Sequence, residues 1–326
     1  MFRTLRFATY TSLLALCGLA SSASAAELNV VASFSIIADF AKNVGGDRVA
    51  ISTLVGPDGD AHVYQPRPAD AVSLEGADVV LVNGLQFEGF MSRLIETSGT
   101  KAAVVEVSKG VEPLNSAEEE QHHDGEAKAE AADSHDHDAA AEAEAGHNHG
   151  GFDPHAWQSI HNAEIYVKNI ANAFCEADKA GCATYTANSE AYLVKLGALE
   201  TEVKAAIDSI PAEQRTIITS HDAFGYFARD YGVKFIAPEG ISTEAEASAA
   251  DVAKLVDQVK EDKASAIFVE NITNPRLVEQ IAQETGLEVG GTLYSDALSG
   301  TDGPAPTYID MFRYNVDTIR SAIVGG

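Results

Sequence analysis

The sequence predicts an α/β fold with two lobes, each built on a parallel sheet, joined by a long rigid helix. Apolar strand-like segments alternate with amphipathic helical patterns in both halves of the chain. The strand segments are almost continuously apolar, as expected for parallel strands covered on both faces. Between the halves, a helix of about 26 residues, and so about 40 Å long, is predicted from one apolar seam formed by Tyr192, Leu196, Leu199, Val203, Ala206 and Ile210.

The first half contains four predicted strands. We expect them at residues 27–33, 49–55, 78–83 and 102–107, with helices at 36–44, 68–74 and 87–96. Gly45 and Gly46 close the first helix. A loop rich in Gly, Pro and Asp at residues 56–60 follows the second strand.

The connection is predicted to be helical, and the second half repeats the alternation. Asn162 is a candidate cap for a helix ending near residue 176, and Pro211 ends a helix that starts near residue 184. Further strands are expected at 216–220, 233–237, 266–270 and 287–293, with helices at 223–231, 248–261, 275–285 and 306–323. The chain is therefore predicted to divide into four parts. They are a signal peptide at residues 1–26, an N-terminal lobe at 27–160, a helical connection at 161–210 and a C-terminal lobe at 211–326.

The N-terminus has the features of a secretory signal. Arg3 and Arg6 precede a short apolar run, and Ala23-Ser24-Ala25 or Ser24-Ala25-Ala26 supplies small residues for cleavage. Cys17 follows the large residue Leu16, which disfavours lipid attachment. We therefore expect a cleaved signal, a mature chain from about Ala26 and a periplasmic location.

The net charge narrows the classes of binding partner, and the cysteine content indicates how the two mature cysteines are used. The formal net charge of −27 makes nucleic acid and anionic membranes poor partners. Two cysteines remain after the signal, Cys175 and Cys182, and in an exported chain a pair favours one disulfide. A zinc-ligand pair is the alternative, but no histidine lies near them in sequence.

Residues 116–151 form a tract rich in histidine and acid. The tract lacks large apolar side chains, so we expect it to be disordered. Histidines spaced among carboxylates are typical of a loose divalent-metal collector. The six histidines of this accessory site are His122, His123, His135, His137, His147 and His149.

Four other polar residues lie where ligands bind in α/β folds, beyond the carboxyl ends of strands. His62 follows the second strand, His155 follows the acidic tract, His221 follows the first strand of the second half, and Asp296 follows the last strand. Two lobes facing each other would bring all four into the cleft between them. His161 is interpreted as a capping or surface residue.

Five motifs resemble a known family. They are Gly-Asp-Ala-His-Val-Tyr-Gln-Pro at 59–66, Asp-Pro-His-Ala-Trp at 153–157, Ser-His-Asp-Ala-Phe-Gly-Tyr-Phe at 220–227, Gly-Ile-Ser-Thr-Glu-Ala-Glu at 240–246 and Tyr-Ser-Asp-Ala-Leu at 294–298. Together these motifs resemble the metal-binding solute-binding proteins of ABC transporters, cluster A-I, and specifically the zinc branch of ZnuA-like and AztC-like proteins.

The resemblance implies one tight Zn(II) site between the lobes, with His62, His155 and His221 as imidazole ligands and Asp296 as the carboxylate. It also implies a non-enzymatic monomer that delivers zinc to an inner-membrane ABC permease, with a zinc chaperone as a further candidate partner. The manganese branch typically has glutamate at the position of His221, so this histidine favours zinc. Neutral imidazoles are needed for binding, so affinity is expected to fall below about pH 6.5.

Three alternatives stay open from the sequence. A manganese-binding member of the same family would share the fold. A zinc hydrolase would keep three ligands and an open position, although no general base is evident. A periplasmic zinc buffer or chaperone would act through the histidine-rich tract itself. Within the cleft site, a water molecule in place of Asp296 also stays open as the fourth ligand.

Overall fold

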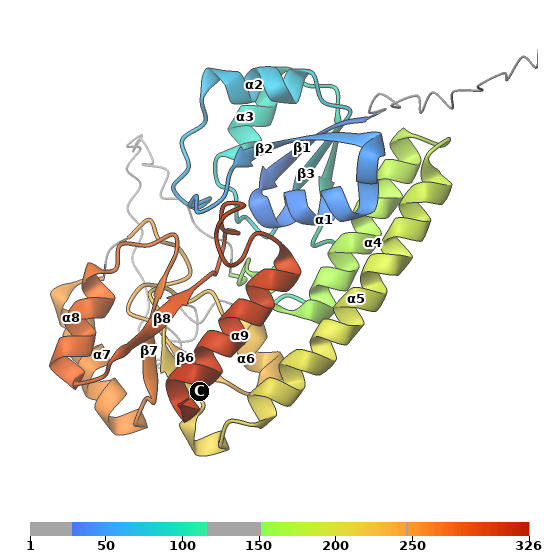
Figure 1. Ribbon diagram of the computed structural model, residues 1–326. Coiled ribbons are helices and arrows are strands. Elements are labelled where there is room, and N and C mark those ends of the chain that lie inside the picture. The colour runs from blue at the N-terminus through green and yellow to red at the C-terminus, as the bar shows by residue number, and fades with distance from the viewer. Residues whose placement is uncertain (1–27, 116–150, 246, 326) are drawn as a thin grey trace, which may run out of the picture.

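A computed structural model describes residues 28–115, 151–245 and 247–325, and Figure 1 shows two lobes stacked against a pair of long helices. The predicted signal peptide and the six accessory histidines lie outside the described residues. Each lobe contains a four-stranded parallel sheet, as the sequence predicted.

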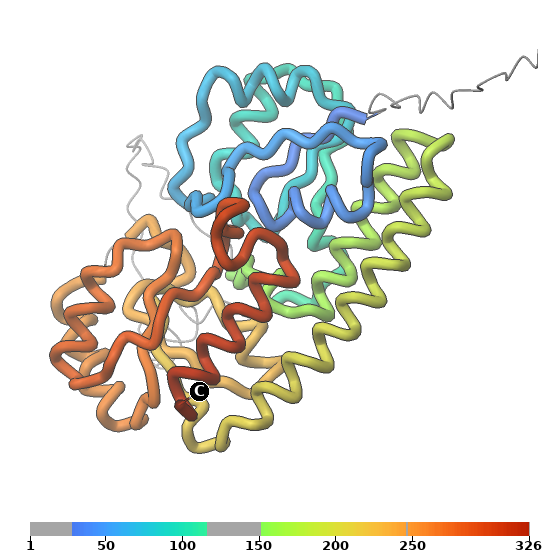
Figure 2. The backbone as a smooth tube through the Cα atoms, in the orientation of Figure 1, coloured from blue at the N-terminus to red at the C-terminus, as the bar shows by residue number. Residues whose placement is uncertain are grey.

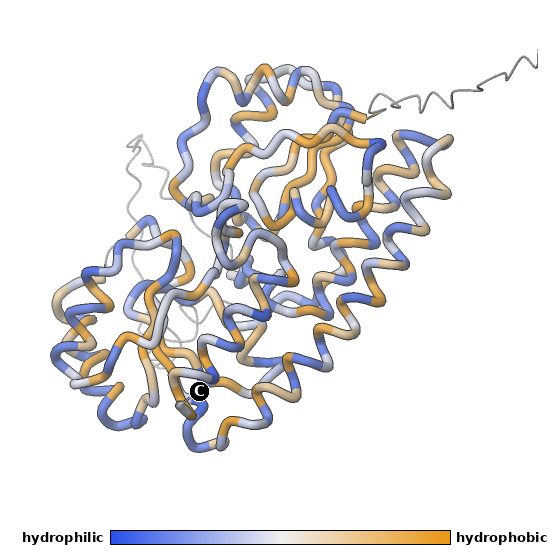
Figure 3. Tube along the Cα trace, in the orientation of Figure 1, coloured by the Kyte–Doolittle hydropathy of each residue, from blue (hydrophilic) through white to orange (hydrophobic). Residues whose placement is uncertain are grey.

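The N-terminal sheet has the strand order β2-β1-β3-β4. Its strands are β1 (Leu28–Phe34), β2 (Val49–Val55), β3 (Val79–Val82) and β4 (Ala103–Glu106), and its helices are α1 (Ser35–Gly45), α2 (Pro68–Glu75) and α3 (Met91–Ser98). In Figure 3 the strands at the centre of this lobe are coloured predominantly hydrophobic. The side chains of β3 are all buried, as expected for an internal parallel strand.

Two antiparallel helices connect the lobes. They are α4 (Ile160–Ala177) and the 27-residue α5 (Cys182–Asp208). Figure 1 shows α5 running along both lobes, with α4 beside it along the N-terminal lobe. The seam predicted for the long helix is buried except at Ala206, which is half-buried, and Cys175 and Cys182 form a disulfide at the turn between the helices. The predicted N-cap of α4, Asn162, was wrong by three residues. The N-cap is Ser159, whose hydroxyl accepts a hydrogen bond from the Asn162 N–H.

The C-terminal sheet repeats the topology with the order β6-β5-β7-β8. Its strands are β5 (Thr216–Ile218), β6 (Lys234–Ile236), β7 (Ala266–Glu270) and β8 (Val289–Leu293), and its helices are α6 (Gly225–Tyr231), α7 (Ala249–Asp262), α8 (Arg276–Thr285) and α9 (Tyr308–Val324). Figure 2 shows the backbone passing from β8 up to the N-terminal lobe before it returns as α9.

The hydrophobic core crosses the boundary between the lobes. One cluster of buried residues runs from β1 and α1 through α4 and α5 to α6 and α9, and it includes Phe40, Trp157, Leu196, Phe227 and Phe312. A second, smaller cluster lies between the C-terminal sheet and the helices α7 and α8. The two lobes therefore share one continuous core on the side of α5, and α7 and α8 form a separate outer layer.

Candidate metal centre

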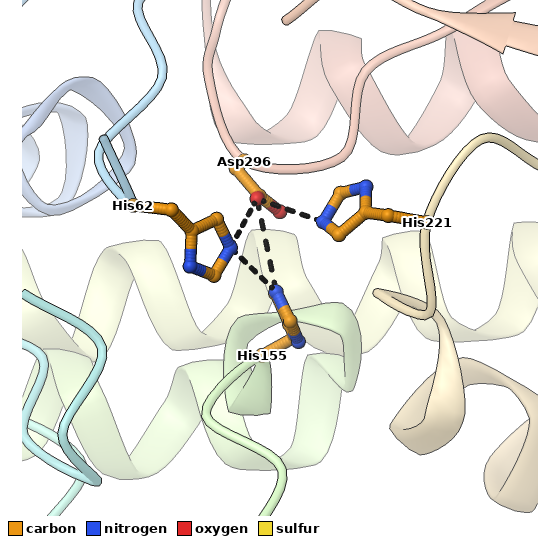
Figure 4. Close-up of side chains that lie close together, drawn as sticks. All are labelled: His62, His155, His221 and Asp296. Atoms are coloured by element: carbon orange, nitrogen blue, oxygen red, sulfur yellow. Dashed lines mark hydrogen bonds and ion pairs between the residues drawn. The ribbon is translucent and has the colours of Figure 1, made fainter. Parts of the chain in front are cut away.

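The four residues predicted to meet in the cleft do meet there. His62 lies in the loop between β2 and α2, His155 precedes the short 3₁₀ helix Ala156–Gln158, His221 follows β5, and Asp296 follows β8. Because the carboxyl ends of the strands in both sheets face the same cleft, the loops that carry these side chains converge. All four are buried, and Figure 4 shows them pointing toward one another.

The distances within this group fit one small cation. Asp296 Oδ2 lies 3.1 Å from His221 Nε2, 3.2 Å from His62 Nε2 and 3.7 Å from His155 Nε2, and His62 Nε2 lies 3.3 Å from His155 Nε2. The ligand atoms of all four residues lie within 4.8 Å of one another. Neighbouring ligands of a tetrahedral zinc ion, with bonds of about 2.0 Å, are about 3.3 Å apart.

The second oxygen of Asp296 supports the same conclusion. Its Oδ1 is buried and has no hydrogen-bond partner among the described residues. An uncompensated buried carboxylate oxygen is costly, and a bound cation would remove that cost. Three imidazole nitrogens and a carboxylate are a plausible ligand set for zinc.

Two carboxylates that sequence reasoning did not assign hold the imidazole rings from behind. Asp153 Oδ1 lies 2.8 Å from His155 Nδ1 and accepts the His155 backbone N–H at 2.9 Å. Glu270 Oε2 lies 2.7 Å from His221 Nδ1. With Nδ1 facing a carboxylate, each ring presents Nε2 to the cleft, which is the arrangement that fixes metal-binding histidines.

The signals for these two carboxylates were present in the sequence. Asp153 lies two residues before His155 in the quoted motif, and Glu270 is the last residue of a predicted strand. Both positions are near the carboxyl edge of a sheet, where the candidate ligands were sought. What the sequence could not supply is which carboxylate faces which ring.

The surroundings of His62 differ from those of the other two rings. His62 stacks edge-on against Phe87, with the ring centroids 4.8 Å apart. Burial is the largest influence on its pKa and lowers it, against the attraction of Asp296. His62 is therefore the imidazole most readily kept neutral in the metal-free protein.

At His155 and His221, the nearby carboxylates together have more influence on the pKa than burial has. Burial would lower the pKa of His155, but the charge of Asp296 and the hydrogen bond to Asp153 outweigh it and raise the pKa to about 9. The pKa of His221 is likewise raised, because Glu270 and Asp296 outweigh its burial. Burial would raise the pKa of Asp296, yet the two imidazoles hold it well below its usual range.

Backbone and side-chain contacts tie the ligand loops together. Trp157 Nε1 and Gln158 Nε2 donate to the Ser295 carbonyl at 2.9 and 2.6 Å. The segment that carries His155 therefore fixes the segment that carries Asp296. His161, by contrast, is exposed on α4 and lies outside the cluster, in agreement with its interpretation as a surface residue.

Comparison with known proteins identifies the family. The sequence profile of the family described as "Zinc-uptake complex component A periplasmic" matches residues 30–322. The chain belongs to this family. Its members are metal-binding proteins that serve ABC transporters as substrate-binding components.

Individual relatives bind different metals. The chain is 34% identical to the iron-binding protein YfeA of Yersinia pestis over 98% of this chain and 94% of that protein. It is 33% identical to the manganese-binding lipoprotein MntA of Bacillus subtilis (strain 168), over 97% of this chain and 96% of that protein.

Solved structures share the architecture. The periplasmic zinc-binding protein TroA of Treponema pallidum superposes with a TM-score of 0.78 at 30% identity, covering 91% of this chain and 99% of that one. A manganese-bound periplasmic metal-binding protein of Candidatus Liberibacter asiaticus gives a TM-score of 0.76 at 30% identity, with 91% and 99% coverage. Among the described residues of this protein, no helix is both long enough and apolar enough to span a membrane.

Proposed function

We propose that this protein binds Zn(II) in the cleft between its lobes and delivers it, in the periplasm, to an inner-membrane ABC permease. One observation carries the proposal, the buried group formed by His62, His155, His221 and Asp296, whose ligand atoms lie within 4.8 Å of one another. Membership of a family of transporter components supports the delivery role and a permease as the partner.

The ligand chemistry supports zinc over manganese. Three of the four proposed ligand atoms are imidazole nitrogens, and nitrogen-rich sets favour zinc, whereas manganese prefers oxygen. The metal is cargo in this proposal, so the protein holds it without transforming any substrate. The six histidines of residues 116–150 act as an accessory collector that raises the zinc concentration near the cleft.

A manganese-binding function is the second candidate, since relatives with a third of their residues in common are named for manganese. A carboxylate with one oxygen still available could add a further oxygen ligand for that ion. Zinc buffering through the histidine-rich region is the remaining alternative. It would place the tight site outside the cleft.

Titration separates these functions. Zinc and manganese are each titrated, against a competing chelator, into the mature chain and into the chain lacking residues 116–150. We expect one tight zinc equivalent in both, and additional weaker zinc only in the mature chain. His221→Ala should weaken the tight site by about two orders of magnitude or more, because it removes a ligand from a four-ligand set. The control is His161→Ala, which removes an exposed histidine outside the cluster.

Each failure has a distinct meaning. Loss of the tight site on deletion of the tract would place binding in the tract. A tight site that prefers manganese would support the second candidate. Turnover of ester or phosphoester substrates by the zinc-loaded protein, abolished by His221→Ala, would overturn the transport role in favour of a hydrolase.

A further inference from the structure

Asp60 joins the two sides of the cleft. Its Oδ1 accepts a hydrogen bond from the His62 backbone N–H at 2.8 Å. Its Oδ2 accepts one from the hydroxyl of Thr243 at 2.6 Å, a residue 183 positions away in the C-terminal lobe. One carboxylate thus fixes the backbone of a proposed ligand in one lobe while holding a side chain of the other lobe.

The segment that carries Thr243 is also attached to the opposite proposed ligand. It follows β6, and Glu239 forms a parallel bridge with His221. The Glu239 N–H donates to the Ser220 carbonyl at 3.3 Å, and the Asp222 N–H donates to the Gly240 carbonyl at 3.1 Å. A continuous series of contacts therefore runs from the backbone of His62, through Asp60 and Thr243, to the backbone at His221.

This segment can move at lower cost than the lobes can rotate. Ile241 is buried with 5% of its surface exposed, but residues 242–245 and 247–250 are half-buried or exposed. Rotation of the lobes would instead disturb the core that is continuous across them. The free energy needed to open the cleft increases with the apolar surface that becomes exposed. Local release of the segment that carries Thr243 therefore costs less than rotation of the lobes.

We propose that the hydrogen bond between Thr243 and Asp60 is a clasp that keeps the cleft closed and slows metal dissociation. The inference rests on the proposed function, since it assumes a metal held by His62 and its partners. Thr243 acts as a positioning residue: it touches no metal ligand atom, and it acts through Asp60 on the His62 backbone. Breaking the clasp frees one wall of the cleft and loosens one ligand at the same time.

The test compares dissociation rates. Wild-type protein, Thr243→Val, Thr243→Ser and Thr201→Val are loaded with zinc and mixed rapidly with excess chelator. Valine has nearly the shape of threonine without the hydroxyl, whereas serine keeps the hydroxyl. Thr201→Val makes the same chemical change on an exposed turn of α5. Melting temperatures of all four proteins report whether folding is intact.

We expect Thr243→Val to release zinc about tenfold faster, since a hydrogen bond to a charged acceptor contributes about that factor. Its association rate should stay within about twofold of wild type, because the open cleft is unchanged. Thr243→Ser and Thr201→Val should dissociate as wild type does. A purely structural defect would instead lower the melting temperature and slow association as well as accelerate dissociation.

Three results would overturn the clasp while leaving zinc binding in place. They are an unchanged dissociation rate in Thr243→Val, equal acceleration in Thr201→Val, and equal acceleration in Thr243→Ser. If wild-type protein lacking residues 116–150 binds no zinc tightly, the proposed function itself fails, and the clasp fails with it.

Discussion

Glu270 contacts His221 with both of its carboxylate oxygens. Oε2 lies 2.7 Å from the ring nitrogen Nδ1, and Oε1 accepts the backbone N–H of His221 at 2.9 Å and that of Ser220 at 2.8 Å. The carboxylate is fully buried, so it fixes the ring and the backbone of the same residue. The tautomer of His221 that offers Nε2 to a metal depends on this one side chain.

Glu270→Gln should therefore weaken zinc binding by about 10- to 100-fold. The amide oxygen can still accept the two backbone N–H groups, so the amide nitrogen is left facing Nδ1. Two donors cannot share that contact, and the ring shifts its proton to Nε2, which then cannot bind metal. Competitive titration measures the loss. Glu190→Gln, an exposed position on α5, is the matched control.

Asp153→Asn should have a smaller effect than Glu270→Gln. A single oxygen, Asp153 Oδ1, contacts both Nδ1 and the backbone N–H of His155. The amide oxygen of asparagine can occupy that place and keep both contacts. Equal losses of zinc affinity in the two variants would show that negative charge, rather than hydrogen-bond geometry, holds the rings.

Zinc binding near pH 7.5 should release about two protons per metal. In the metal-free protein the pKa of His155 is raised to about 9 and that of His221 is also raised, whereas the pKa of His62 is lowered. Only neutral imidazole binds zinc, so the two raised groups must lose their protons. Affinity should therefore fall as pH decreases from about 9, a higher window than the unperturbed value of 6.5 suggests.

Calorimetry in buffers with different ionisation enthalpies counts these protons. The slope of the observed enthalpy against the buffer enthalpy is the number released. Asp296→Asn should reduce that number along with the affinity, because it removes the charge that both imidazoles share. Release of fewer than one proton per zinc by the wild-type protein would contradict the prediction.

The sequence predicted the two sheets, the long connecting helix and the four clustered residues. These features depend on periodicity, on the position of residues after strands, and on motifs that match a family. The contacts behind the site were not predictable in this way. Thr243 meets Asp60 across 183 residues, and nothing in either local sequence indicates that pairing.

Local backbone geometry explains one misplaced boundary. A helix was expected from residue 87, but α3 begins at Met91. Gly84, Leu85 and Gln86 have φ values of 85°, 52° and 61°, so the chain makes a left-handed turn after β3 before the helix starts. Glycine alone signals such a turn, and the two residues that follow it usually avoid this conformation. The Asn83 N–H donates to Glu88 Oε1 across this turn at 2.7 Å, and the Ser33 hydroxyl of β1 donates to the same oxygen at 2.5 Å.

Asp39 should make the stability of the fold depend on pH. Burial raises its pKa to about 6 from a usual 3.8, against hydrogen bonds from the Tyr308 N–H and the Tyr192 hydroxyl. The folded state therefore binds this proton more tightly than the unfolded state does. Its stabilising contribution, about 3 kcal/mol, is complete below about pH 4 and is lost as pH rises through about 6.

Asp39→Asn removes that dependence. Relative to wild type, the free energy of unfolding of the variant should rise by about 3 kcal/mol between pH 4 and pH 8, because asparagine keeps an oxygen for both donors and carries no charge. Denaturant titrations of metal-free protein at several pH values measure the difference. Asp47→Asn, on the surface beyond α1, should track wild type. A constant difference across the range would show that Asp39 does not titrate with folding.

Metal preference should follow the chemistry of position 221. His221→Glu replaces an imidazole nitrogen with oxygen, so zinc affinity should fall about tenfold more than manganese affinity. The new carboxylate would face Glu270, and two buried like charges repel each other. Combining His221→Glu with Glu270→Gln removes that repulsion and supplies a donor, so the double variant should bind manganese more tightly than the single one.

The comparison requires four proteins and two metals. Wild type, the single variant His221→Glu, the double variant, and His161→Glu as an exposed control are titrated with zinc and with manganese against a chelator. Preference for zinc should fall only in the two proteins altered at position 221. If the ratio of the two affinities stays at the wild-type value in both, selectivity does not reside in the donor type at this position. It would then have to come from the size and rigidity of the cleft, and the carboxylates behind the rings would be the next residues to change.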